Sequence, residues 1–248
     1  MQNYPKLNRP EPIELENSSP ADEFVFEAIL KRRICLEDAA RSNKNKHPLK
    51  RLFDISVSLI VLVIASPLML LTALMIKLTS PGPVFFKQQR VGFMGKVFTM
   101  YKFRTMEVKT DSGIHQEYVT DLFSSDRPMV KIDNCHRLIP FGQIIRRLFI
   151  DELPQLFNVV RGQMSLVGPR PAIPYEVQAY QDWHMGRLLT LPGMTGLWQV
   201  SGKNRLTFNE MVRLDIQYAH GCSFLTDMKI LMITPIAIIS EVRNKQNQ

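Results

Sequence analysis

The sequence has few of the residues that build disulfide-rich or zinc-binding proteins. Its 248 residues include three cysteines, Cys35, Cys135 and Cys222, which lie far apart and form no Cys-x-x-Cys pair. An odd number of widely spaced cysteines predicts neither a disulfide framework nor a zinc site. This cysteine usage fits a reducing compartment.

The chain also lacks a secretory signal and the common nucleotide-binding motifs. Residues 1–18 are polar, with three prolines and without a basic start or an apolar core, so we expect a disordered tail. The glycine-rich stretches match neither the dinucleotide fingerprint nor the P-loop. His115 and His136 lack the spacing of metal ligands, and we assign them no function.

Acidic residues are outnumbered by basic ones, 23 against 31, which gives a formal net charge of +8 at pH 7. Such a charge predicts anionic partners, among them nucleic acid, acidic lipid head groups and phosphorylated substrates. The long apolar segment of the chain favours the lipid and the phosphorylated substrates. We therefore expect no nucleic acid partner.

One apolar run dominates the sequence. Between Leu59 and Ile76, 18 residues carry no charge, and at about 1.5 Å per helical residue they approach the bilayer's hydrocarbon thickness of about 30 Å. Ser66 and Pro67 lie in the middle, where the proline removes a backbone donor and clashes with the preceding turn. We expect a membrane helix that kinks or breaks at this pair.

The charges beside this run do not select an orientation for a spanning helix. Lysines and arginines cluster on both sides of it, at positions 50, 51, 77, 87 and 90, so the two ends do not differ in the way that the positive-inside rule uses. A kinked spanning helix is the commoner arrangement, since such prolines are tolerated in membranes. A helix that folds back at Ser66-Pro67, with both ends on the cytoplasmic face, explains the flanking charges as well.

A hairpin and a basic segment are expected next. Residues 84–86 and 97–101 are typical of short strands around a loop from Gly92 to Gly95. Rings and cations alternate over residues 101–106, so Lys102 and Arg104 are expected to share a strand face and clamp a phosphate. A solvated charged face is the commoner alternative for such a pair. Residues 107–133 are polar, and we expect a loop or a loosely helical insertion.

The spacing of apolar residues predicts further helices. Residues 19–34 are typical of a short amphipathic helix, residues 207–218 of a second helix, and residues 223–227 of the start of a last one. The apolar part of the last helix, residues 229–240, is too short and too interrupted by Pro235 to span a bilayer. We therefore place it along the membrane interface.

An acidic pair precedes another helical pattern. Apolar residues from Leu153 to Val160 follow helical spacing and Gly162 provides a stop. Asp151 and Glu152 then lie at the helix start, where negative charge is favoured. Ordinary capping explains an acid at this position, whereas a catalytic pair requires cations nearby.

Cations do flank the pair in the sequence. Arg146 and Arg147 lie just upstream, and Arg170 is held between two prolines in an extended loop that suits bidentate phosphate binding. Residues 191–204 form a second glycine-rich loop, whose glycines are expected to permit close approach to a ligand and whose Lys203 offers a cation. Trp198 packs on that ligand or on the core.

Together these stretches resemble one family, the bacterial sugar transferases, which are monotopic phosphoglycosyl transferases acting on polyprenyl phosphate. The resemblance covers about residues 50–243. It rests on the order and spacing of the motifs Lys50-Arg51-Leu52-Phe53-Asp54, Ser66-Pro67, Ser80-Pro81-Gly82-Pro83, Tyr101-Lys102-Phe103-Arg104-Thr105-Met106, Asp151-Glu152-Leu153-Pro154-Gln155, Val167-Gly168-Pro169-Arg170-Pro171 and Pro192-Gly193-Met194-Thr195-Gly196.

The resemblance implies an α+β fold that is mainly helical, with a re-entrant membrane helix broken at Ser66-Pro67, a small β-hairpin and interfacial amphipathic helices. We divide the chain into an N-terminal tail with a short helix (1–48), the re-entrant helix (49–79), a cytoplasmic catalytic domain (80–243) and a C-terminal tail (244–248). The implied location is the bacterial inner membrane, with the active site facing the cytoplasm. A homodimer is kept as an alternative to a monomer.

The resemblance also implies a reaction: transfer of a sugar 1-phosphate from a nucleoside diphosphate sugar, here expected to be a UDP-sugar, to polyprenyl phosphate. In the family the aspartate of the acidic pair is the nucleophile and the glutamate binds Mg²⁺, which implies these roles for Asp151 and Glu152. This transfer initiates the synthesis of bacterial surface polysaccharides or glycoconjugates.

Other site residues follow from matching positions. Lys102, Arg146 and Arg170 match basic residues that line the family's phosphate site, and we add Arg104 and Lys203 from the two basic stretches. Two acids of the C-terminal part also match, Asp215 and Asp227. The chain departs from the family by carrying lysine at position 203, where arginine is frequent, and by lacking a serine or threonine just before the acidic pair.

Two other functions are kept open. A membrane-anchored adaptor would use the basic surface to hold anionic lipid, with no need for Asp151. A hydrolase would use the same acidic pair with water as the acceptor. The adaptor predicts that Asp151→Asn leaves function intact, and the hydrolase predicts release of free sugar phosphate without a lipid acceptor.

Overall fold

The structure is a computed structural model that describes residues 48–107 and 138–244. The predictions made for the N-terminal tail and its short helix, for most of the polar insertion, for His115 and His136, and for the last residues lie outside these ranges. The described elements are, in order, α3 (Pro48–Thr79), β1 (Phe85–Val91), η1 (Phe93–Gly95), β2 (Val97–Phe103), α5 (Gly142–Arg147), η3 (Ile150–Glu152), α6 (Gln155–Val160), β3 (Ser165–Val167), α7 (Pro174–Gln178), η4 (Asp182–Leu189), β4 (Gly193–Thr195), α8 (Leu197–Val200), η5 (Lys203–Arg205), α9 (Phe208–Gly221) and α10 (Phe224–Asn244).

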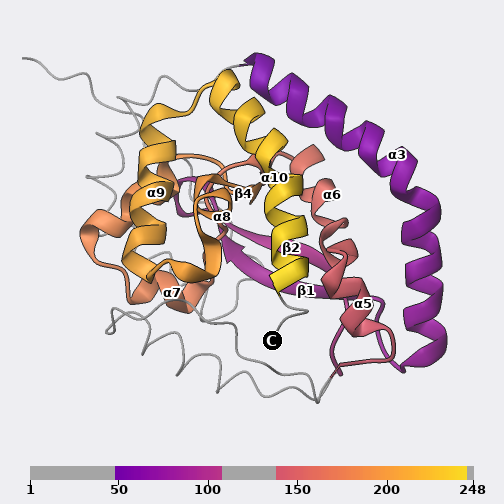
Figure 1. Cartoon of the computed structure of the whole chain (residues 1–248). Coiled ribbons are helices and arrows are strands. Elements are labelled where there is room, and N and C mark those ends of the chain that lie inside the picture. The colour runs from indigo at the N-terminus through magenta and orange to yellow at the C-terminus, as the bar shows by residue number, and fades with distance from the viewer. Residues whose placement is uncertain (1–47, 108–137, 245–248) are drawn as a thin grey trace, which may run out of the picture.

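The apolar run forms a single helix, α3, of 32 residues with Pro67 inside it. Pro67 has no N–H to donate to the carbonyl four residues earlier, that of Val63. The hydroxyl of Ser66 donates to this carbonyl instead, at 2.8 Å. The helix is therefore uninterrupted, which corrects the predicted break, and it changes direction about midway in Figure 1, as the alternative prediction of a kink requires. Among the described residues, α3 is the one helix long and apolar enough to cross a membrane.

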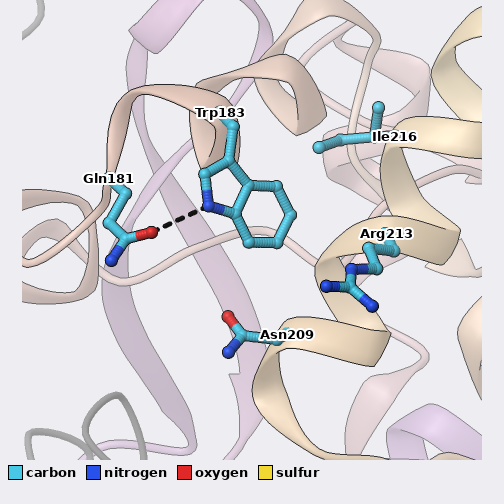
Figure 2. A pocket seen from close by; sticks show the side chains of 5 residues that line it. All are labelled: Gln181, Trp183, Asn209, Arg213 and Ile216. Carbon is cyan, nitrogen blue, oxygen red and sulfur yellow. Dashed lines mark hydrogen bonds between the residues drawn. The ribbon is translucent and has the colours of Figure 1, made fainter.

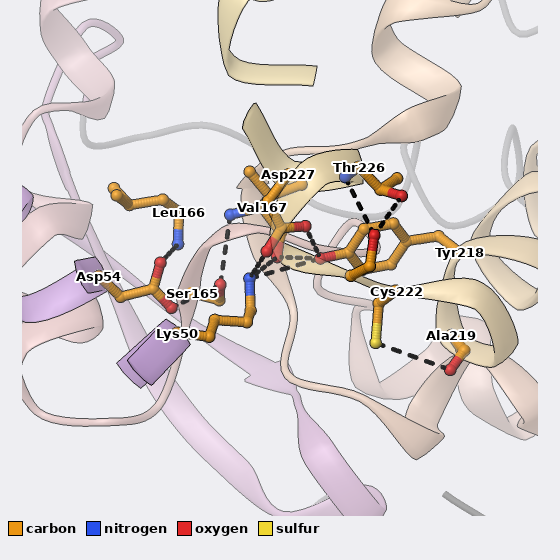
Figure 3. Close-up of polar contacts among 11 residues, drawn as sticks. Lys50, Asp54, Ser165, Leu166, Val167, Tyr218, Ala219, Cys222, Thr226 and Asp227 are labelled. Carbon is orange, nitrogen blue, oxygen red and sulfur yellow. Dashed lines mark hydrogen bonds and ion pairs between the residues drawn. The ribbon is translucent and has the colours of Figure 1, made fainter. Parts of the chain in front are cut away.

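The first turns of α3 are bound to the rest of the molecule by polar side chains. Lys50 forms an ion pair with Asp227 of α10, and Asp54 accepts a hydrogen bond of 2.8 Å from the hydroxyl of Ser165 (Figure 3). Arg51 donates to the carbonyls of the last two residues of α6, at 2.6 and 2.9 Å. A cation at these carbonyls satisfies acceptors that the helix itself leaves without donors.

The other end of α3 is bound as well. Ile76 is buried in an apolar cluster with Phe103, Ile139 and Ile145. Just after the helix, the guanidinium of Arg104 donates to the carbonyls of residues 80 and 81, at 2.9 and 2.6 Å. One folded domain therefore holds both ends of the apolar helix.

The predicted hairpin is confirmed, with longer strands than expected. β1 and β2 pair antiparallel from Phe85↔Phe103 to Val91↔Val97. The second sheet, in which β3 and β4 pair parallel, was not predicted. Its glycines allow two backbones to touch, since a Cβ on Gly193 would lie 2.0 Å from the nitrogen of Gly168, and a Cβ on Gly196 would lie 2.2 Å from the oxygen of Gly168. The two glycine-rich stretches therefore pack against each other. For Gly193 and Gly196 of the second stretch, the predicted close approach is to the backbone of Gly168 and not to a ligand.

The C-terminal helices follow the predictions closely. Thr207 caps α9, together with Glu210. α10 is one helix of 21 residues that continues through Pro235. It exposes a series of apolar side chains, Leu225, Met232, Ile236 and Ile239, as expected for an interfacial helix. Trp198 is buried in the core.

Candidate active site

The acidic pair lies in η3, a single turn that precedes α6. Phe149 is the N-cap of this turn, with a φ of 56° in the left-handed region, and Pro154 is the N-cap of α6. The pair was predicted in the first turn of the helix, whereas the structure places it one turn earlier. Asp151 is 9% exposed, and Glu152 is more open to solvent.

Opposing influences act on the pKa of Asp151. Burial and the charge of Glu152 raise the pKa of Asp151 to about 6, while the cations Lys102 and Arg146 act in the opposite direction. The carboxylate form still predominates at neutral pH, and it has lost most of its hydration. A partly desolvated carboxylate between cations is suited to attack an electrophile.

Lys102 connects the hairpin to the acidic pair. It lies near the end of β2, and its ammonium group is 2.8 Å from a carboxylate oxygen of Glu152. Arg104, two residues later, is buried and donates to the turn after α3. The prediction of a common phosphate clamp is thereby corrected: Lys102 is at the acidic pair, and Arg104 holds the C-terminal end of α3.

Two further predicted cations approach the pair. Arg146 lies in the last turn of α5, is exposed, and interacts electrostatically with Asp151. The ammonium group of Lys203, in η5, lies 5.0 Å from the ring centre of Phe149, two residues before Asp151. The glycine-rich stretch around residue 200 thus contributes a cation beside η3.

Arg170 belongs to a neighbouring group that the sequence analysis did not identify. Its guanidinium faces the buried carboxylate of Glu176 at 3.6 Å. Arg90, which is 7% exposed, has its pKa lowered to about 10 by burial and by Arg170, while Glu176 and Glu152 act in the opposite direction. Arg90 therefore lies within electrostatic reach of both Arg170 and the acidic pair. The sequence offers one signal for Arg90, which is its position as an arginine near the end of a strand; its burial is seen only in the structure.

The two C-terminal acids serve the framework. Asp215 is buried and forms an ion pair with the equally buried Arg187 of η4. Asp227 is also buried, pairs with Lys50 and accepts a hydrogen bond of 2.6 Å from the hydroxyl of Tyr218. These contacts join elements of the fold to one another and do not involve the acidic pair.

The residues present fit a magnesium ion held together with a substrate. Among the described residues, no group of three or more histidine, cysteine, aspartate and glutamate side chains could hold a metal ion by itself. Mg²⁺ is usually bound by one or two carboxylates, with waters and substrate phosphates as the other ligands. Asp151 and Glu152 offer such carboxylates, and Glu152 is the more exposed of the two.

A groove of about 420 Å³ lies elsewhere, between η4 and α9 (Figure 2). Trp183 forms part of its wall and donates to the amide oxygen of Gln181 at 2.8 Å. Arg213 lies 5.9 Å from the ring centre of Trp183. The other lining residues are Asn209 and Ile216. None of the predicted site residues lines this groove, so we seek the substrate site at the acidic pair.

Known proteins are similar to this chain in sequence, and three of them have the following identities. The exopolysaccharide production protein ExoY of Rhizobium meliloti (strain 1021) is 37% identical over 191 residues, 76% of this chain and 84% of the relative. The undecaprenyl-phosphate galactose phosphotransferase of Salmonella typhimurium is 42% identical over 226 residues, 87% of this chain and 45% of the relative. The UDP-glucose:undecaprenyl-phosphate glucose-1-phosphate transferase of Xanthomonas campestris is 36% identical over 200 residues, 77% of this chain and 39% of the relative.

The chain thus spans most of the Rhizobium relative and less than half of the other two. The sequence family described as bacterial sugar transferase matches residues 45–241, which include α3 and every residue of the candidate site. With this match and these identities, the chain belongs to the bacterial sugar transferases and is an enzyme, a sugar-phosphate transferase.

Proposed function

We propose that the protein transfers a sugar 1-phosphate from a UDP-sugar to undecaprenyl phosphate and releases UMP, as the initiating step in the synthesis of a bacterial surface polysaccharide. The observation that carries the proposal is a buried carboxylate, Asp151, between Glu152 and the cations Lys102 and Arg146. The names of the Salmonella and Xanthomonas relatives support the acceptor, and that of the Xanthomonas relative supports the donor class.

In the first half-reaction, a carboxylate oxygen of Asp151 forms a bond to the phosphorus that bears the sugar. The bond from this phosphorus to the bridging oxygen of the diphosphate breaks, and the nucleoside monophosphate leaves with that oxygen. Lys102, Arg146 and Arg170 neutralise the charge on the phosphoryl oxygens. Mg²⁺, when bound through Glu152, supplies further charge neutralisation at the diphosphate.

In the second half-reaction, an oxygen of undecaprenyl phosphate attacks the phosphorus of the aspartyl phosphosugar. The bond from this phosphorus to the carboxylate oxygen breaks, which regenerates Asp151 and yields a sugar linked to the lipid through a diphosphate. The two substrates use the same nucleophile in turn, so the proposal requires ping-pong kinetics.

The acceptor is a lipid, and the acidic pair lies beside the apolar surface of the protein. Ile145 of α5 and Ile150, which adjoins Asp151, pack with the second half of α3. α5 also exposes Ile144 and Leu148, on the same short helix as Arg146. Apolar surface and the positive charge of Arg146 thus lie on one short helix, which supports an acceptor with a hydrocarbon tail and a phosphate head group.

We also propose that α3 enters one leaflet and returns to the cytoplasmic face. A straight helix of 32 residues is about 48 Å long, longer than the hydrocarbon core of about 30 Å. In this protein one domain binds both ends, through Arg51 at the start and Arg104 at the end. A perpendicular spanning helix would carry its ends to opposite faces, where a single domain does not reach both.

A trapping experiment tests the chemistry. Protein in detergent is incubated with UDP-sugars radiolabelled in the sugar, without lipid acceptor, and the label that remains on the denatured chain is counted. We expect label on the wild type and on Asp182→Asn, a control at an exposed aspartate, and none on Asp151→Asn. Label that persists on Asp151→Asn would refute the covalent mechanism. Free sugar phosphate released in place of bound label would favour the hydrolase.

A labelling experiment tests the topology. Leu49 and Leu78 are equally exposed at the two ends of α3, and each is replaced by cysteine in a chain without its native cysteines. A membrane-impermeant maleimide is then added to intact spheroplasts and to inverted vesicles. We expect both cysteines to react only in inverted vesicles. Reaction of the two ends from opposite sides would overturn the re-entrant arrangement.

A further inference from the structure

The loop that carries Arg170 is fixed along its backbone. Four successive carbonyls, from residue 169 to residue 172, each accept a hydrogen bond: from the backbone of Gly193, from Arg187, from Arg90 and from the backbone of Val91, at 2.8, 3.2, 2.8 and 2.8 Å. Pro169 and Pro171 restrict the same segment further. The side-chain torsions of Arg170 are then the main freedom left at this position.

The two arginines that hold this backbone are themselves buried and anchored. Arg187 donates to the hydroxyl of Tyr180 at 2.8 Å and pairs with Asp215. Arg90 donates to the amide oxygen of Gln88 at 2.6 Å. Burying a guanidinium group is costly, and hydrogen bonds from the terminal nitrogens offset part of that cost, although the Nε of each arginine has no hydrogen-bond partner among the described residues. Both arginines donate to the backbone of the short segment around Arg170. Two buried cations therefore hold this loop.

Glu176 supplies the remaining restraint. It is 3% exposed, and its two carboxylate oxygens have different tasks. One accepts the backbone N–H of Ile173 at 2.9 Å and caps α7, and the other faces the guanidinium of Arg170 at 3.6 Å. The capping bond alone does not require a charge, because a neutral glutamine oxygen would accept it as well. Arg170 itself stays 32% exposed in its side chain, so it is available to a ligand.

We infer that Glu176 is a positioning residue, whose buried carboxylate orients the Arg170 guanidinium for the diphosphate of the nucleotide sugar. This inference rests on the proposed function, in which Arg170 binds phosphate. In this role Glu176 acts through Arg170 and does not itself contact the substrate. A guanidinium held at a fixed angle loses less conformational freedom on forming a bidentate contact, which is the advantage of preorganisation.

The test is a double-mutant cycle with full-length protein in detergent. The variants are Glu176→Gln, Arg170→Ala and the two combined, and UDP is the probe ligand. Glu176→Gln keeps the capping acceptor and removes the charge. The matched control is Glu210→Gln, since Glu210 accepts the equivalent capping bond at the start of α9, from Thr207 at 2.8 Å. The Kd for UDP and the kcat/KM for UMP release from a UDP-sugar are measured for each variant.

We expect Glu176→Gln to weaken UDP binding and to lower kcat/KM by about tenfold in the wild-type background. In the Arg170→Ala background the same substitution should change both by less than about twofold, because the group it orients is gone. Glu210→Gln should change neither. Rescue is tested with Glu176→Asp, which keeps the charge but shortens its reach, and which should restore less than half of the lost affinity.

Equal losses from Glu176→Gln in the two backgrounds would overturn the inference, and so would a Kd for UDP unchanged by Glu176→Gln. Thermal unfolding midpoints separate these results from a folding defect. If Glu176→Gln folds poorly, the Kd for UDP and the kcat/KM are compared for Glu176→Asp in the two backgrounds instead. Failure of the proposed function looks different. A wild type that releases no UMP would refute the proposed reaction, and an Arg170→Ala variant that binds UDP normally would refute the phosphate role of Arg170.

Discussion

The ammonium group of Lys102, near the end of β2, lies 2.8 Å from the carboxylate of Glu152 in η3. The two residues are 50 positions apart in the chain, and their contact brings the hairpin to the acidic turn. Both side chains are partly exposed, so the pair contributes little to stability, about 1 kcal/mol or less. Under the proposed mechanism, its position beside Asp151 gives it more weight in phosphate binding than in folding.

Replacing Lys102 by methionine should therefore affect catalysis far more than stability. We expect kcat/KM for UMP release to fall by about a hundredfold, because a cation at the developing phosphoryl charge is lost. The unfolding free energy should change by less than about 1 kcal/mol. Lys87→Met, at an exposed position of β1, is the control. Equal activity of the two variants would show that Lys102 does not act on the transferred phosphate.

The ion pair between Lys50 and Asp227 should be important for folding. Asp227 is almost fully buried, so Lys50→Met leaves it without its cation, at an expected cost of about 3 kcal/mol. Denaturant unfolding in detergent measures this loss, and Lys229→Met, at an exposed lysine of α10, is the control. The double variant Lys50→Met/Asp227→Leu should recover much of the stability. If Lys50→Met unfolds like the wild type, the pair does not anchor α3.

The contact between the two glycine-rich stretches predicts a sharp difference between two alanine substitutions. A Cβ at Gly193 would meet backbone 2.0 Å away, whereas a Cβ at Gly221 meets nothing within 4 Å. Gly193→Ala should cost at least about 3 kcal/mol, because backbone on both sides must move. Gly221→Ala, in the last turn of α9, should lie within about 1 kcal/mol of the wild type. Similar unfolding midpoints for the two would contradict the close packing of β3 and β4.

Glu176 should make the free energy of unfolding depend on pH in acidic solution. Burial raises its pKa, but Arg170 and Arg90 outweigh burial and hold the pKa below the ordinary value of 4.5. The unfolded chain then binds a proton at a higher pH than the folded chain does, so the stabilisation is complete above pH 4.5 and is lost as the pH falls below it. Unfolding free energies from neutral pH down to about pH 3 should decline less steeply for Glu176→Gln than for the wild type. Parallel curves would show that the carboxylate is not stabilised in the folded state.

Much of the fold could be predicted because its signals are local. The apolar run of α3, the Gly92 to Gly95 loop and the Thr207 cap each lie within a few residues of the structure they determine. The site could be predicted in part, since Asp151, Glu152, Lys102 and Arg146 do come together. Most of the predictions that the structure corrects depend on partners that lie far away in the sequence.

Arg104 illustrates the limit. Strand alternation predicts the face on which a side chain lies, but the carbonyls of residues 80 and 81 that accept from Arg104 are fixed by tertiary packing. The same holds for the parallel pairing of β3 with β4, two strands of three residues each, which depends on a backbone contact between distant glycines. Ser66 is a different case, since a local hydroxyl bond to Val63 compensates for the proline that was expected to break the helix.

The attachment of α3 at both ends has a consequence for how this enzyme meets its substrates. Under the proposed topology, a domain that α3 binds at Arg51 and again at Arg104 stays at a fixed distance from the bilayer. The enzyme then meets the lipid acceptor by lateral diffusion within one leaflet, while the nucleotide sugar reaches the site by diffusion from solution. Turnover should then follow the surface density of the acceptor in the membrane rather than its bulk concentration.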